Sequence, residues 1–233
     1  MTPEITTRSF SNDQLTFDKV FFDNLYNLKS GKEKDSKELK KVFVDIGAHA
    51  GFFAFSALVL GAKKVYCFEP YIDNFNVLLK NCYTHSFVGR VTPYQLGVYT
   101  QPMIGKFSAP ELIDGLYFDL AGIGLSISDG SYYPCQCVTL DTILREYCFD
   151  EQVDVLKINI GYAEKEILLG SEILPKNVNS VCGEVSCSDS EFAEFKKSMG
   201  IKGFINCYST PLNDKGRIQF WMSKTNLSDN FIK

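Results

Sequence analysis

The sequence lacks any long hydrophobic run, and no segment approaches the roughly 18 consecutive apolar residues that a membrane-spanning helix needs. The opening stretch, MTPEITTRSFSNDQ, also lacks the basic region and the apolar region that mark a secretory signal. Together these absences lead us to expect a cytosolic protein.

An excess of positive charge is missing as well. Lys and Arg number 24 against 28 Asp and Glu, which gives a formal net charge of −4 at pH 7 and an isoelectric point near 5.3. Proteins that bind nucleic acid neutralise its phosphates with Lys and Arg, and a basic domain is their usual footprint. The charge balance therefore argues against nucleic acid as a partner.

The patterns of a zinc site or a disulfide framework are also absent. The eight cysteines include no CxxC pair, and the chain has only two histidines, His49 and His85. Cys135 and Cys137 would point to the same face of a strand, but two thiols do not complete a tetrahedral zinc site. We therefore expect no metal site, and reduced, mostly buried thiols.

What the sequence does have is a regular alternation of predicted strands and helices after residue 40. With 233 residues, of which 45% are hydrophobic and 22% charged, the chain can bury one full core. The predicted strands cover 41–46, 64–70, 91–99, 153–160, 178–187, 202–209 and 213–223, and the helices 51–60, 71–86, 163–174 and 190–200. Strands alternating with helices predict an α/β fold, with a parallel sheet between two layers of helices and an antiparallel strand near the C-terminus.

Two segments fall outside this alternation. Residues 1–40 form a predicted N-terminal extension, in which residues 15–28 have the pattern of an amphipathic helix. Residues 102–134, inside the single predicted domain 41–233, are rich in glycine and aromatic residues. That insertion is either an additional piece of sheet or a mobile cover over a substrate.

The stretch VFVDIGAHAGFFAF, residues 42–55, marks the first candidate site. It begins as a buried strand and continues as an apolar helix, with Gly47 and Gly51 on either side of the bend. In open α/β sheets, ligands bind beyond the carboxyl ends of the strands. Glycine lets a ligand approach the backbone closely, and the start of a helix favours an anion. The bend is therefore either a floor for a polar ligand or a tight turn without one.

Glu69 ends the second predicted strand, 24 residues after Asp45. A carboxylate there can accept hydrogen bonds from both vicinal hydroxyls of a ribose, which indicates a nucleoside-containing cofactor. An acid at this spacing also occurs in NAD-binding proteins, but the bend lacks their G-x-G-x-x-G register. A bare G-x-x-x-G does not decide between cofactors.

The full set of landmarks resembles the FkbM-type methyltransferases from about Lys41 to the end of the core. The residues that carry the resemblance are VDIGAHAGFF, VYCFEP, Asn74, Asn81, TLDTIL and VDVLKINIGYAE. The resemblance implies a Rossmann-like class I methyltransferase fold, with a seven-strand sheet whose last strand is antiparallel. It also implies S-adenosylmethionine as cofactor and methylation of hydroxyl groups on natural products or sugars.

By this resemblance the bend would hold the methionine part of the cofactor, although the family usually has asparagine where His49 stands. Glu69 would hold the ribose, Tyr71 would lie against the adenine unless it is an ordinary surface aromatic, and two residues of the third strand would close the far side. The implied cofactor-binding residues are Asp45, Gly47, Ala48, His49, Gly51, Glu69, Tyr71, Gly97 and Val98.

The sequence departs from the family in the fourth strand. The family pattern is K-I-D-x-E-G-x-E, whereas residues 157–164 read KINIGYAE. Asn159 cannot accept a proton, although its amide can orient an acceptor. Glu184, near the end of the next strand, is then the candidate base, unless it is a solvated strand-end residue. Lys157 either binds an acidic group or pairs with Glu164.

The sequence therefore predicts a methyltransferase that acts on a small hydroxylated substrate, with Glu184, Asn159 and Lys157 as candidate catalytic residues. The altered fourth strand also allows an acceptor that needs no strong base, such as an amine or an acidic hydroxyl. A degenerate protein that binds cofactor or a partner without turnover is the main alternative. An NAD-linked enzyme is the third, and nothing in the sequence indicates an oligomeric state.

Overall fold

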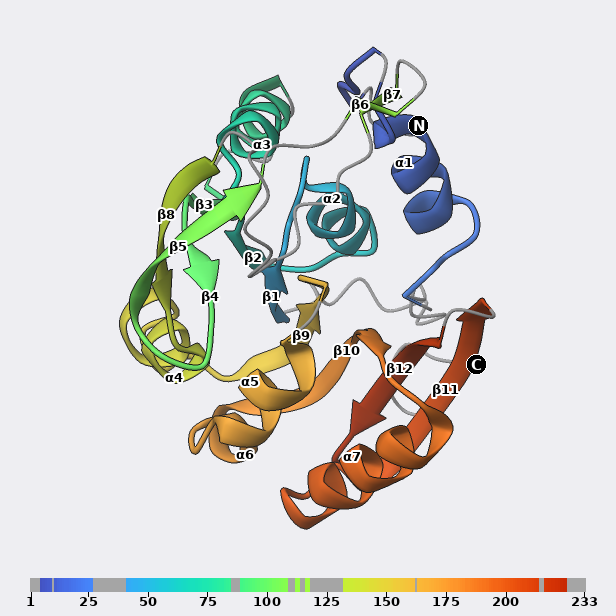
Figure 1. The fold of residues 1–233 in the computed structure, drawn as a ribbon. Coiled ribbons are helices and arrows are strands. Elements are labelled where there is room, and N and C mark those ends of the chain that lie inside the picture. The colour runs from blue at the N-terminus through green and yellow to red at the C-terminus, as the bar shows by residue number, and fades with distance from the viewer. Residues whose placement is uncertain are drawn as a thin grey trace, which may run out of the picture.

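Figure 1 shows the fold as a computed structural model. The structure describes residues 5–9, 11–26, 41–84, 89–108, 112–113, 116–117, 132–161, 163–213 and 216–225.

A seven-stranded sheet forms the centre of the protein, in the order β11-β12-β10-β9-β1-β2-β3. Its strands are β1 Val42–Ile46, β2 Lys64–Phe68, β3 Val91–Tyr94, β9 Val153–Ile158, β10 Val178–Ser186, β11 Asn206–Asn213 and β12 Arg217–Ser223. The neighbours from β3 to β10 pair in parallel, while β12 runs antiparallel to both β10 and β11. This arrangement confirms the predicted mostly parallel sheet with an antiparallel strand at its C-terminal end.

Helices cover both faces of the sheet (Figure 1). They are α1 Asp13–Phe21, α2 Phe52–Val59, α3 Ile72–Thr84, α4 Leu140–Thr142, the π-helix η1 Ile143–Tyr147, α5 Glu164–Gly170, α6 Leu174–Asn177 and α7 Asp189–Ile201. Successive strand residues point to opposite faces, so Phe43 packs with α1, α2 and α3 while Val44 packs with η1, α5 and α7. The sheet thus separates two apolar cores, and we call the side of Phe43 the α2 face.

Two predicted elements have different limits in the structure. The N-terminal helix, predicted over 15–28, ends at Phe21, and Asn24 then takes a left-handed conformation (φ 51°) that a helix cannot continue through. The predicted strand 91–99 is wrong as one element. Leu96 donates a backbone hydrogen bond to Tyr94 in a tight turn, which divides the segment into β3 and a separate short strand, β4 Gly97–Val98.

The predicted insertion at 102–134 forms additional sheet where it is described. Strand β8, Tyr132–Val138, lies between β4 and β5, Met103–Ser108, in a three-stranded sheet. A second small pair joins β6, Leu112–Ile113, to β7, Leu116–Tyr117. The mobile cover was the other interpretation, and it concerns mainly 118–131, which lies outside the described residues.

All eight cysteines are free, and six of them are buried. Within the part of the chain that the structure describes, no group of three or more His, Cys, Asp or Glu side chains could hold a metal ion. The same part contains no helix that is long and apolar enough to cross a membrane.

Candidate cofactor and acceptor site

The bend after β1 is attached by hydrogen bonds to the end of β2. The backbone N–H groups of Gly47 and Ala48 donate to the carbonyl oxygen of Phe68 at 2.9 and 3.1 Å. The backbone N–H of His49 donates to Oε2 of Glu69 at 2.7 Å. The structure therefore brings the two landmarks of the sequence, the glycine-containing bend and the acid of the second strand, into direct contact.

The two glycines of the bend are required by the packing around them. Gly47 has φ +75°, and a Cβ there would lie 2.1 Å from the carbonyl oxygen of Asn159. Gly51 has φ +91°, and a Cβ there would meet the side chains of Phe55 and Leu78 at 2.5 and 2.6 Å. Protein atoms thus fill the space that a side chain would need at either position, so packing alone requires glycine there. That the bend also holds a ligand stays a prediction.

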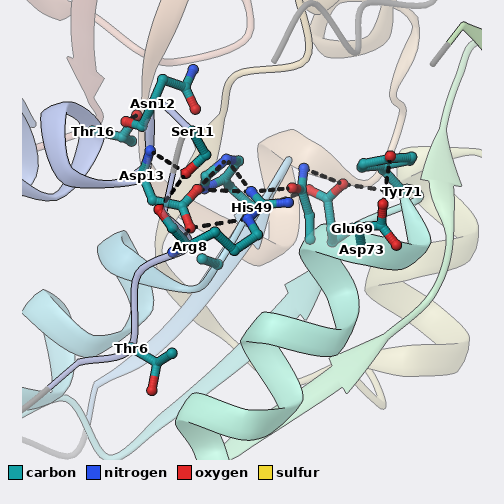
Figure 2. A network of polar contacts seen from close by, with 12 residues as sticks. Thr6, Arg8, Ser11, Asn12, Asp13, Thr16, His49, Glu69, Tyr71 and Asp73 are labelled. Atoms are coloured by element: carbon teal, nitrogen blue, oxygen red, sulfur yellow. Dashed lines mark hydrogen bonds and ion pairs between the residues drawn. The ribbon is translucent and has the colours of Figure 1, made fainter. Parts of the chain in front are cut away.

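Glu69 is buried, 4% exposed, and its carboxylate faces the bend (Figure 2). Besides the bond from His49, it accepts hydrogen bonds from the backbone N–H of Tyr71 at 3.0 Å and from the amide of Asn74 at 3.4 Å. Tyr71 is itself buried, and its hydroxyl donates to Asp73 at 2.7 Å. The alternative of an ordinary surface aromatic is therefore wrong for Tyr71, whose ring lies beside Glu69.

The backbone conformation explains why histidine can replace the asparagine of the family. His49 has φ 53°, in the left-handed region where asparagine and histidine are enriched among residues other than glycine. Its ring then lies 3.5 Å from Oδ1 of Asp13 and 3.3 Å from the guanidinium of Arg8. Histidine thus keeps the bend and reaches the N-terminal segment as well.

Two residues of the N-terminal segment, Arg8 and Asp13, lie next to the candidate site, and the sequence did not reveal this. Arg8 pairs with Asp13 at 2.7 Å (Figure 2). It also donates to the Oδ1 of Asn74 on α3 at 2.7 Å. Burial raises the pKa of Asp13, but the hydrogen bond from Arg8 and the charge of His49 outweigh it and hold this pKa below its usual value. The segment is therefore joined to the bend through charged and polar side chains.

Asn81, seven residues after Asn74 on α3, attaches the N-terminal segment to this helix a second time. Its amide nitrogen donates to the carbonyl oxygens of Ala50 and Thr6, both at 3.1 Å, and its Oδ1 accepts from the Thr6 N–H at 2.8 Å. Asn74 and Asn81, noted only as landmarks in the sequence, therefore hold the N-terminal segment and the bend to the same helix.

A pair of substitutions at His49 separates its backbone role from its side-chain role. We expect His49→Asn to change the free energy of unfolding by less than about 1 kcal/mol, because asparagine keeps the left-handed bend and only partly exposed contacts are lost. His49→Val should cost about 1–3 kcal/mol more, because a β-branched residue is strained there. Urea unfolding followed by circular dichroism measures both, and equal stability of the two variants would contradict this explanation.

Lys157 is occupied by a structural ion pair. Its ammonium lies 2.9 Å from Oδ1 of Asp45 in the neighbouring strand and donates to the carbonyl of Gly47 at 2.6 Å. Burial alone would lower the pKa of Lys157, but the carboxylate of Asp45 outweighs it and holds this pKa above its usual value. Lys157 and Asp45, which were both predicted to be site residues, therefore lie beneath the bend and pair with each other.

The alternative that Lys157 pairs with Glu164 is wrong. Glu164 turns instead to the loop before its own helix, where Oε1 accepts the backbone N–H groups of Ile160 at 2.8 Å and Gly161 at 2.5 Å. Tyr162, which replaces a glycine of the family pattern, lies outside the described residues.

Asn159, which directly follows β9, and Glu184 of β10 lie on the same side of the sheet. Cys182 of β10 is in register with Lys157 of β9, so the residues two positions further along each strand also share the α2 face. Glu184 is buried, with its side chain 8% exposed and 3.3 Å from the guanidinium of Arg217. The alternative of a solvated strand-end glutamate is therefore wrong.

The amide nitrogen of Asn159 donates to the hydroxyl of Tyr26 at 3.2 Å. Tyr26 belongs to the N-terminal segment, and the sequence offered no signal for it beyond one position in a predicted helix. The bend and Glu69 thus lie at the carboxyl ends of β1 and β2. Asn159 and Glu184 lie at the carboxyl ends of β9 and β10.

The remaining predicted cofactor residues, Gly97 and Val98, form β4. Val98 is 3% exposed and packs in the core with Phe68, so only its backbone could contact a ligand. Gly97 pairs with Cys137 of β8. Ala48 is also buried, within the α2-face core.

A family model described as the methyltransferase FkbM domain matches residues 45–210, which is most of the chain. The chain belongs to the FkbM methyltransferase family. The match begins within β1 and extends into β11, so the N-terminal contacts of the FkbM domain, made by Arg8, Asp13 and Tyr26, precede it.

Solved structures of two human proteins with low sequence identity share the fold of this FkbM domain. The human methyltransferase 10 domain containing protein superposes with a TM-score of 0.52 at 14% identity, covering 84% of this chain and 77% of that one. The N-terminal domain of human METTL16 in complex with SAH gives 0.50 at 14% identity, covering 95% and 73%. An FkbM methyltransferase from Methylobacillus flagellatus gives 0.48 at 16% identity, and this chain spans about half of it, 47%. No curated protein matched the sequence.

Proposed function

We propose that this protein is an S-adenosylmethionine-dependent methyltransferase that methylates a hydroxyl group of a small substrate, such as a sugar or a natural product. The observation that carries the proposal is the position of Glu69. Its carboxylate is buried at the end of β2 and faces the glycine-containing bend, with His49 N–H 2.7 Å from Oε2. Membership of the FkbM family supports methyl transfer as the reaction.

The residues around Glu69 fit an adenosine-bearing cofactor. An ionised carboxylate only accepts hydrogen bonds, which suits the two vicinal hydroxyls of a ribose. Tyr71 lies next to it and would contact the adenine, while Ala48 and His49 of the bend would lie along the methionine part. When bound, the cofactor supplies an electrophilic methyl group on a sulfonium.

The protein's own part in the reaction is to position the acceptor and remove its proton. Alignment of a nucleophile with the methyl group supplies much of the rate, and an alcohol also needs a base within hydrogen-bond reach. Glu184 is the carboxylate we assign as this base, and Asn159 orients the acceptor beside it. Lys157 has no place in this chemistry, because its charge is used by Asp45.

Calorimetric titration with S-adenosylmethionine tests the cofactor site. We expect Glu69→Gln to weaken binding by about 10- to 100-fold, because hydrogen bonds to a charged acceptor are each worth about 1.5–3 kcal/mol. Glu194→Gln, an exposed glutamate on α7, is the matched control and should leave the affinity unchanged. Equal affinity of the Glu69 variant and the wild-type protein would refute the assignment, and tighter binding of NAD than of S-adenosylmethionine would refute the cofactor.

A non-catalytic protein that binds the cofactor or a partner without turnover is the second candidate. It is favoured by Asn159, which stands where the family has an aspartate and whose amide is hydrogen-bonded to Tyr26. Transfer of tritium from labelled S-adenosylmethionine to any small acceptor would exclude this candidate. Cofactor binding without transfer to any acceptor would favour it.

A further inference from the structure

Tyr26 is held at the candidate acceptor site by contacts with α2, with β9 and with the residue that follows β9. Its ring makes an edge-on contact with Phe53 of α2, with centroids 5.2 Å apart. The ammonium of Lys157 lies 5.7 Å from the centroid of the same ring, and Asn159 binds the hydroxyl. With 5% exposure, the side chain has little freedom to turn away. The hydroxyl is therefore a fixed polar group beside the end of β9.

The contacts that the described residues make with this hydroxyl use only its oxygen. Its oxygen accepts from the Asn159 amide at 3.2 Å, but among the described residues no oxygen or nitrogen accepts its hydrogen. A buried O–H without an acceptor is costly, and such groups in native structures usually have a partner or a function. A ligand atom that accepts this hydrogen would complete the arrangement.

The hydroxyl also stays protonated. Burial raises the pKa of Tyr26, the charge of Lys157 opposes this, and the charge of Glu184 raises it further, so that the net pKa lies above the usual value for tyrosine. At neutral pH, Tyr26 is therefore a hydrogen-bond donor and cannot act as a base.

A site that offers both a hydrogen-bond donor, Tyr26, and a base, Glu184, would favour a hydroxyl over an amine as nucleophile. A hydroxyl oxygen has two lone pairs, so it can accept a hydrogen bond with one and attack a methyl group with the other. An amine nitrogen has one lone pair, and a hydrogen bond from Tyr26 would occupy it. Glu184 shares the α2 face with Asn159 and can receive the proton that a hydroxyl loses.

We propose that Tyr26 donates a hydrogen bond to the oxygen of the methyl acceptor and thereby selects hydroxyl groups over amines. The inference rests on the proposed function and adds to it a residue that lies outside the family match. In the step, the bond between sulfur and the methyl carbon breaks as the bond from the acceptor oxygen to that carbon forms. The hydroxyl proton passes to Glu184, and the cofactor leaves as the neutral thioether S-adenosylhomocysteine.

The test compares Tyr26→Phe with wild-type protein. Phenylalanine keeps the ring that packs on Phe53 and removes only the hydroxyl. Tyr83→Phe, on the exposed side of α3, is the matched control. Each protein receives tritiated S-adenosylmethionine with paired acceptors that differ in one group, phenol with aniline and cyclohexanol with cyclohexylamine, and with the small-molecule fraction of a cell extract. Mass spectrometry distinguishes methyl ethers from methylamines, and calorimetry measures cofactor affinity.

We expect wild-type protein and the Tyr83 variant to form methyl ethers. Tyr26→Phe should lower kcat/KM for the hydroxyl acceptor by about 10- to 100-fold, because a buried hydrogen bond in the reacting complex is lost, while cofactor affinity stays within about twofold. Hydroxyl turnover by Tyr26→Phe within twofold of wild type would overturn the role of Tyr26 and leave the proposed function intact. Wild-type preference for amines would overturn both the role of Tyr26 and the proposed hydroxyl acceptor, and only methyl transfer itself would stand. Absence of transfer by every protein would overturn both.

Discussion

Replacing Lys157 by methionine is expected to lower the free energy of unfolding by about 3–5 kcal/mol, because removing one partner of a buried ion pair leaves the other charge uncompensated. Asp45 is fully buried, and its carboxylate lies 2.9 Å from the lysine ammonium. Methionine has nearly the volume of the lysine stem, so the loss would come from charge and hydrogen bonding more than from packing. Urea unfolding at pH 7 followed by circular dichroism measures the effect.

The pH dependence of this loss identifies its cause. Burial already raises the pKa of Asp45 in the native protein, and the charge of Lys157 opposes that rise. Without Lys157, the folded-state pKa of Asp45 rises further above its unfolded value. A raised folded-state pKa favours folding below the unfolded pKa and loses that contribution as pH increases, so the deficit of the variant should shrink toward acid pH.

Lys196→Met, an exposed substitution on α7, serves as the control and should change stability by no more than about 0.5 kcal/mol. If Lys157→Met were as stable as this control at pH 7, Lys157 would not be a structural residue. Its role as a substrate-binding cation would then return.

Gly47→Ala is expected to destabilise the protein by about 2–5 kcal/mol, through two effects that add. A left-handed conformation costs a non-glycine residue about 1–2 kcal/mol, and overpacking adds about 1–3 kcal/mol. At Gly47 both apply, because φ is +75° and a Cβ would lie 2.1 Å from the Asn159 carbonyl oxygen. A backbone oxygen cannot move aside as the end of a flexible side chain can, so strand β9 itself would have to shift.

Gly203→Ala is the matched control for Gly47→Ala. Gly203 also has a left-handed backbone, φ +95°, but a Cβ there would meet nothing within 4 Å. It should therefore show the backbone cost alone, about 1–2 kcal/mol. Urea unfolding measures the loss of stability in both variants, and the difference between the two losses is the cost of the close approach between Gly47 and the Asn159 carbonyl. Equal losses would contradict this explanation.

The sequence predicted the sheet well where strands are buried on both faces. Runs such as 42–46 and 153–158 are apolar almost throughout and lie next to helical patterns, so their type and order were readable. The division of residues 91–99 into two strands was harder to predict. The turn at Leu96 transfers the chain to a second sheet without any glycine or proline at that residue. The short N-terminal helix ended early at a left-handed Asn24, which an amphipathic pattern does not reveal.

The candidate site was predictable only in part, for a related reason. Glu69 and the bend lie at the ends of consecutive strands, so their spacing placed them together. The partner of Lys157 could not be chosen from the sequence, because Asp45 and Glu164 are both acids and only the strand register brings one of them within 2.9 Å. Arg8 and Tyr26 reach the site through tertiary packing, which leaves no local pattern.

The central claim is that the bend after β1 and the carboxylate of Glu69 together hold an adenosine-bearing cofactor. A crystal structure of the protein with S-adenosylhomocysteine tests it most directly. We expect the ribose hydroxyls to lie within hydrogen-bond distance of the Glu69 carboxylate, with the homocysteine part against Ala48 and His49. A ribose bound away from Glu69, or a homocysteine part that does not contact Ala48 or His49 at saturating ligand, would contradict the claim.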